Sequence, residues 1–147
     1  MTILETIRSW LMTWPGQTRL HSFRVDYTDA APNSGGIRPQ GLTEQTYSRD
    51  ILGNLTVENR YIFGLYYVLE KAPGDDPGAE ENALWLLELQ NWVQAQCAAG
   101  LAPQLGDDPA RQHIRLENGV LYAADDEGTA TYRATLSVRF VKHYEGE

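Results

Sequence analysis

The sequence has a single cysteine, Cys97, and few basic residues. One cysteine excludes a disulfide within the chain and a metal site built only from cysteines of one chain. Because Cys97 falls in a segment of apolar periodicity, we expect a buried structural thiol rather than a nucleophile. The chain has 12 Lys and Arg against 20 Asp and Glu, and a net charge of −8. Binding to nucleic acid or to an anionic membrane depends on clustered cations, so we expect neither.

Long apolar runs are missing as well. No stretch approaches the roughly 18 apolar residues that are needed to span a membrane. The first residues, MTILETIRSWLMTW, contain Glu5 and Arg8 within the apolar run and lack a small-residue cleavage site, unlike a signal peptide. We therefore predict a protein without a membrane partner that is made in the cytoplasm.

The residues that are abundant are those of a folded protein. Hydrophobic residues make up 42% of the chain and aromatic residues 10%, which is far above the level of a disordered chain. A length of 147 residues suits one domain with one core. We expect a single domain over residues 1–147.

Two segments have the apolar spacing of helices. Residues 2–14 begin with the spacing of a capping box, carry an apolar stripe at steps of three and four, and stop at Pro-Gly. The second helix is expected from Asp76, as its cap, to about Ala99. Gly100 then supplies the left-handed residue that ends it.

Alternation of apolar and polar residues predicts the strands. They are expected at residues 21–27, 42–49 and 58–71, on both sides of Asn118-Gly119, and at residues 130–141. The segment 58–71 is apolar on both faces, as in a strand whose second face is covered. Residues 130–141 alternate cleanly, which predicts one buried and one wet sheet face.

Two connections have distinctive composition. Residues 28–41, TDAAPNSGGIRPQG, hold two prolines and three glycines, which predicts a long loop that is flexible in the isolated subunit. Asn118-Gly119 is the strongest two-residue hairpin signal. A turn there sets Leu116 opposite Leu121 and Ile114 opposite Ala123.

These segments together predict an α+β domain of element order α-β-(β)-β-α-β-β-β. We expect an antiparallel or mixed sheet of four to six strands with two helices packed on one face.

Two acidic pairs, Asp107-Asp108 and Asp125-Asp126, are the first candidates for chemistry. Both pairs fall at predicted turns, where Asp is favoured because its side chain bonds nearby backbone. We favour this turn role. A carboxylate-dependent hydrolase that uses Asp107 and Asp125 is the alternative.

Other catalytic or ligand-binding patterns do not stand out. His21, His113 and His143 have no i, i+4 pairing and no HExxH pattern, and no GxSxG, P-loop or GxGxxG occurs. We predict a protein that is not an enzyme and that has no metal or cofactor.

Four segments, in order, resemble one protein family. They are FRVDY (23–27), ENALWLLELQNWV (81–93), GLAPQLGD (100–107) and ENGVLYAADDEGTATYRATLSVRF (117–140). They are similar to small Firmicutes phage and prophage proteins known as minor capsid or tail-terminator proteins, some of which carry a chloramphenicol-resistance label. The resemblance omits residues 28–57, and none of the three histidines has the HxxxDG setting that such an acetyltransferase needs.

The resemblance implies a structural role in a virion, for a protein made in the bacterial host cytoplasm. Tail terminators cap the tail tube as a ring, commonly a hexamer, and present a surface to the head connector. The implied partners are further copies of the chain, a major tail protein and a head connector or neck protein. A head-closure, neck or other minor capsid protein, or a host-encoded binding module, is the alternative role.

A closed ring needs head-to-tail contacts between two different surfaces. The candidate surfaces are the wet face of the last predicted strand and the predicted loop at residues 29–41. The candidate interface residues are Arg38, Thr131, Arg133, Thr135 and Arg139.

Overall fold

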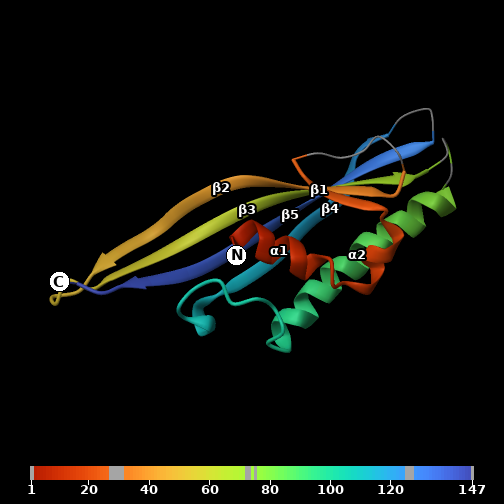
Figure 1. The fold of residues 1–147 in the computed structure, drawn as a ribbon. Coiled ribbons are helices and arrows are strands. Elements are labelled where there is room, and N and C mark those ends of the chain that lie inside the picture. Colours follow the sequence, from red (N-terminus) through yellow and green to blue (C-terminus); the bar gives the residue numbers. More distant parts are fainter. Residues whose placement is uncertain (1, 27–31, 72–73, 75, 125–127, 147) are drawn as a thin grey trace.

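The computed structural model describes residues 2–26, 32–71, 74, 76–124 and 128–146 (Figure 1). Within these residues the chain forms two α-helices, two short 3-10 helices and one five-stranded sheet. The helices are α1 (Ile3–Leu11), η1 (Pro15–Arg19), α2 (Asp76–Ala98) and η2 (Pro109–Arg111). The strands are β1 (Ser22–Val25), β2 (Ser34–Arg49), β3 (Leu55–Glu70), β4 (His113–Ala124) and β5 (Thr129–Tyr144).

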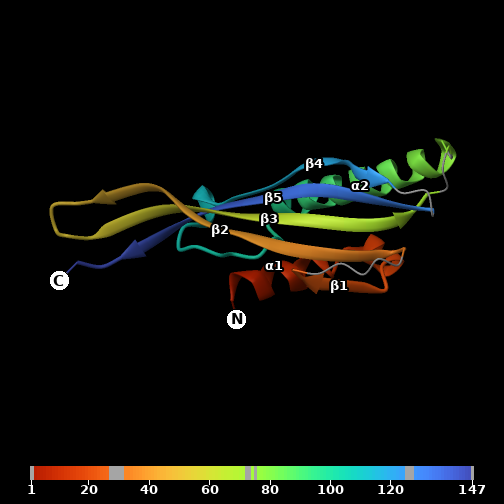
Figure 2. The ribbon, with the colours of Figure 1, turned by 90° about the horizontal axis from the view of Figure 1, so that it is seen from above.

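The sheet has the strand order β1-β2-β3-β5-β4. β1 runs parallel to β2, and the remaining pairs are antiparallel, so the sheet is mixed. Both helices lie on the same side of it, with α1 under β1 and β2 and α2 under β4 and β5 (Figures 1 and 2). This is the predicted α+β class, with five strands.

The core lies between the helices and this side of the sheet. Four tryptophans join the two helices, since Trp10 stacks on Trp92 with ring centroids 5.1 Å apart and Trp14 meets Trp85 at 4.9 Å. Beneath them, alternate residues of β3 and β5 are buried, and those of β5 are the residues that the alternation of 130–141 predicts. They include Phe63, Leu65, Tyr67, Leu69, Tyr132, Ala134, Leu136 and Val138.

The predicted loop at residues 28–41 is wrong for most of its length. Residues 28–31 lie outside the described part, but residues 34–41 belong to β2. A Cβ on Gly35 would lie 2.9 Å from Phe23 Cδ1, so this glycine permits close packing rather than a turn. Pro39 lies beyond Ile37, the last residue of β2 that pairs with β1. Because Ile37 O accepts from Asp26 N, the backbone of Ile37 faces β1, and the nitrogen of Pro39, two residues further on, faces the same side and not β3.

The predicted hairpin at Asn118-Gly119 is also wrong. β4 continues through it with a register irregularity between Glu117 and Val120, and Leu116 lies opposite Leu136 rather than Leu121. A Cβ on Gly119 would lie 3.1 Å from Gln90 Oε1 in α2. Gly119 thus allows the strand to pass close to α2 at an irregularity in its pairing, which is a common role of glycine in strands.

The far ends of β2, β3 and β5 extend beyond both helices (Figures 1 and 2). We call residues 44–57 and 142–146 the arm. Large apolar side chains on the arm are exposed, namely Tyr47, Ile51, Leu52 and Tyr144. The turn at its tip is held by Asp50, whose carboxylate accepts from the backbone N–H groups of Leu52 and Asn54 at 2.9 and 3.0 Å.

Candidate functional site

One side of the sheet is covered by neither α1 nor α2 (Figure 2). We call it the open face. The strand registers place on it Arg38 of β2, Arg60 and Tyr66 of β3, Arg115 and Tyr122 of β4, and Thr131, Arg133, Thr135, Ser137 and Arg139 of β5.

The structure brings all five predicted interface residues together on the open face. Thr131, Arg133, Thr135 and Arg139 alternate along β5, and Arg38 lies opposite Gly64 in the neighbouring ladder. Arg38 was expected in a flexible loop, but it belongs to β2. β2 pairs with β3, and β3 pairs with β5, so only β3 separates Arg38 from the β5 residues. A role of these residues in an interface stays a prediction.

Tyr66 lies at the centre of this cluster, a position that was not predicted from the sequence. Arg38 lies over its ring, with Cζ 4.2 Å from the centroid, and Arg133 approaches the same ring at 5.7 Å. Tyr122 meets it edge-on at 5.8 Å. Arginine over a tyrosine face is a favourable cation–π contact. This contact between Arg38 and Tyr66 depends on the pairing of β2 with β3, which the sequence did not predict.

Gly64 leaves room for this arrangement. A Cβ at this position would lie 3.0 Å from the Tyr66 ring and 2.8 Å from Gln40 Nε2. Tyr66 itself is 9% exposed although no helix covers it. The apolar pattern of residues 58–71 predicts that the second face of this strand is covered. Long polar side chains from the neighbouring strands, Arg38 and Arg133, provide this cover over Tyr66.

The open face is basic within an acidic protein. The strand registers place Glu58 and Glu117 on it, but also five arginines, Arg38, Arg60, Arg115, Arg133 and Arg139. Of these, within the described residues, only Arg115 forms an ion pair, with Glu117 at 3.1 Å. Arg60 Nε donates to Ser137 Oγ at 2.9 Å, and buried Arg133 Nε has no hydrogen-bond partner in the described part of the chain. Such a face suits an acidic partner surface.

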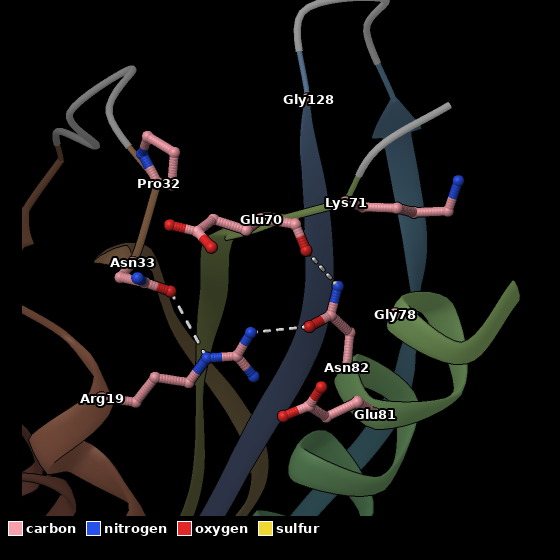
Figure 3. Close-up of a pocket in the computed structure, with 9 residues that line it drawn as sticks. All are labelled: Arg19, Pro32, Asn33, Glu70, Lys71, Gly78, Glu81, Asn82 and Gly128. Atoms are coloured by element: carbon pink, nitrogen blue, oxygen red, sulfur yellow. Dashed lines mark hydrogen bonds between the residues drawn. The ribbon is translucent and has the colours of Figure 1, made fainter. Parts of the chain in front are cut away.

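A polar pocket of about 660 Å³ lies at the end of the sheet remote from the arm (Figure 3). Arg19 Nη2 donates to Asn82 Oδ1 at 2.7 Å, and Asn82 Nδ2 donates to the carbonyl of Glu70 at 3.0 Å. Arg19 Nε also reaches Asn33 Oδ1 at 3.4 Å. Asn82 is 1% exposed, so these bonds connect η1, β3 and α2 in a buried setting.

Arg19, Asn33 and Asn82 are thus engaged with one another, an arrangement that supports the fold. Figure 3 shows Glu70, Lys71 and Glu81 at its rim. In the part of the chain that the structure describes, no group of three or more His, Cys, Asp or Glu could hold a metal ion.

The acidic pair at residues 107–108 bonds to backbone. Asp108 Oδ1 accepts from Ala110 N at 3.2 Å and caps η2, the local role that was predicted. Asp107 reaches further, since its Oδ2 accepts from His143 N of β5 at 2.8 Å. Asp125 and Asp126 lie outside the described residues, so the two pairs are not placed relative to each other.

Histidine and cysteine are dispersed in the structure. His21 Nε2 lies 3.1 Å from the Pro32 carbonyl, and His143 Nδ1 lies 3.1 Å from Thr56 Oγ1. The Cys97 thiol is only partly buried and donates to the Ile114 carbonyl at 3.8 Å. Burial raises the pKa of the Cys97 thiol, which lowers its reactivity at neutral pH.

Comparisons with known proteins add no family assignment. No protein-family model matches this chain, and no match is found among curated proteins. Across the helices that the structure describes, none has the length and apolar character that a membrane crossing needs. The features of this chain that bear on function are the open face, the arm and the four segments that resemble the phage proteins.

Proposed function

We propose that this protein is a non-enzymatic structural protein of a phage virion, a tail terminator whose copies form a ring on the tail tube and join it to the head connector. The observation that carries the proposal is the open face. It holds five arginines, of which Arg38 and Arg133 lie over the Tyr66 ring, and only one of the five has an ion-pair partner among the described residues.

An open face of this kind is suited to contact with another protein. Arginine and tyrosine are enriched at protein–protein interfaces because both combine a large contact area with hydrogen bonding. The cation–π contacts of Arg38 and Arg133 with Tyr66 hold the two guanidinium groups near one place. Both are thereby preorganised, which reduces the entropy lost when an interface forms.

The arm supports an assembly role independently. Ile51 is fully exposed, and Leu52 is 73% exposed, at the tip of the β2–β3 turn. Exposed large apolar residues on a protruding element are common at contacts with other proteins. In a ring, the arm is available to a different component, such as the major tail protein or the connector.

The direct test is the particle formed by the pure protein. Light scattering and negative-stain electron microscopy over a rising concentration series should show closed rings of one size, also on the ends of added tail tubes. A protein that stays monomeric throughout, or that stops at a two-fold dimer, contradicts the proposal. Rings that bind capsid connectors but no tail tubes would assign the protein to head closure instead.

A further inference from the structure

The outward side of α2 is the second unusual surface of the molecule. Its sheet-facing residues are buried, among them Trp85, Leu89 and Val93. On the opposite side, residues at steps of three and four form an exposed line. We call this line, with the adjacent acid Glu88, the α2 stripe; its residues are Glu80, Leu84, Leu87, Glu88 and Asn91.

The α2 stripe is apolar at its centre and acidic at its flanks. Leu84 is 58% exposed and Leu87 is 49% exposed. Glu80 and Glu88 flank them, and the whole of α2 contains no lysine or arginine. A solvated helix normally carries polar side chains on its outer face, so two exposed leucines at this spacing indicate a contact surface.

The open face has the complementary composition. Its exposed aromatic side chain is Tyr122, which is 62% exposed and meets the covered ring of Tyr66 edge-on. The surrounding charge is that of the arginines, of which Arg133 and Arg139 lie on β5. The open face thus offers an exposed aromatic beside arginines, and the α2 stripe offers exposed leucines beside glutamates, so the two surfaces are complementary in charge.

The two surfaces cannot meet within one copy. α2 packs on one side of the sheet and the open face is the other side, so the two point in opposite directions (Figure 1). For the same reason, a two-fold dimer cannot satisfy both contacts at once. A head-to-tail arrangement satisfies both, because each copy offers its open face to one neighbour and its α2 stripe to the other.

We propose that the open face of one copy packs on the α2 stripe of the next copy, and that this head-to-tail contact repeats around the ring. The inference rests on the proposed ring function and names its two surfaces. At 23 residues, α2 is about 35 Å long, which is enough to lie along several residues of the strands that it would cover.

The test is a charge exchange between copies. One variant carries Arg133→Glu and Arg139→Glu on the open face, and a second carries Glu80→Arg and Glu88→Arg on the α2 stripe. Each alone should need about a tenfold or higher concentration to form rings, because like charges then face each other. An equal mixture should restore assembly, since the mutated face of one variant meets the mutated stripe of the other.

A matched control separates pairing from net charge. Glu44→Arg with Glu145→Arg makes the same charge change on exposed positions of β2 and the C-terminal segment. Mixed with a labelled open-face variant, it should form rings by itself and leave the labelled variant outside them. Incorporation of the labelled variant by this control, or failure of the exchanged mixture, would overturn the proposed contact. Circular dichroism establishes that each variant is folded.

Cross-linking provides a second readout that does not depend on charge reversal. In a Cys97→Ser background, Leu87→Cys and Thr135→Cys are placed in separate proteins. Mild oxidation of the mixture should yield a disulfide between the two, and neither protein alone should cross-link. Rings of normal size without this cross-link would reject the contact and leave the ring function standing. A wild-type chain that never assembles would reject both.

Discussion

The arm continues three strands of the covered part of the sheet, but the two regions differ in what stabilises them. In β3, residues 63–69 are all buried, whereas the segment 55–62 is mostly half-buried and runs into the arm. β2 changes in the same way, since it is buried only from Ser34 to Ile37. Strand pairing therefore extends beyond the core, and the helices cover only one end of it.

The difference shows that a ladder can continue where burial has stopped. β2 and β3 stay paired to Arg49 and Leu55, and the Asp50 turn closes the ladder. The arm's apolar side chains contribute little to folding while they are exposed, because the hydrophobic effect acts only on area removed from water. They are more useful in a contact with another protein.

The sharpest way to test this comparison is the same substitution in both regions. Leu89→Ala removes a side chain that is 1% exposed in the core and should lower the free energy of unfolding by about 2–5 kcal/mol. Leu52→Ala, at the tip of the arm, should change it by less than about 0.5 kcal/mol. Urea unfolding of both variants measures the difference. Equal losses would mean that the arm belongs to the folding core.

A second substitution tests the polar connection at the covered end. Asn82→Ala removes the amide that links Arg19 to the Glu70 carbonyl, and it should cost about 1–3 kcal/mol because buried polar groups lose their partner. Asn91→Ala, on the exposed side of the same helix, is the matched control and should have little effect. Thermal unfolding distinguishes the two. An unaffected Asn82→Ala protein would show that the pocket's bonds are not structural.

The covered part should also respond to alkaline pH. Burial raises the pKa of Tyr67 above its ordinary value. The folded state then keeps a proton that the unfolded chain releases above about pH 10, so stability should fall as pH rises through that range. Tyr67→Phe removes the group and should show a shallower loss. Parallel unfolding curves of the two proteins against pH would contradict the assignment.

The smallest expected effect concerns the loop that borders the arm. Asp107→Asn weakens the hydrogen bond to the His143 amide and should cost less than about 1 kcal/mol. Hydrogen exchange at His143 should accelerate, because this bond protects that amide. Asp108→Asn is the control, since it affects the η2 cap and not β5. A chelator-sensitive activity lost in either variant would revive the carboxylate hydrolase.

Periodicity was sufficient to predict most elements. Helix α1 and helix α2 begin and end within a few residues of the predicted bounds, and α2 starts at Asp76, which had been expected as its cap. β5 alternates as predicted because one of its faces is buried along its whole covered length. These are local signals, each read from residues close together in the chain.

The two failures have one cause. Glycine and proline at residues 34–41 and Asn118-Gly119 were read as breaks in the chain. In the fold, Gly35 and Gly119 are places where another element approaches closely, and Pro39 lies beyond the end of the β1–β2 pairing. Glycine is favoured both in a turn and where another element packs closely against the backbone. The local sequence does not distinguish the two cases, because the element that packs there is distant in sequence.

The sequence alone determined the α+β class, the helices and the alternating core of the last strand, because amphipathic periodicity encodes which side of an element is buried. The tertiary structure decided the strand order, the path of β2 and the cluster of Arg38 and Arg133 on Tyr66. That cluster joins three strands whose neighbours are set by long-range pairing. No local pattern specifies such pairing, since the same alternation permits several strand orders.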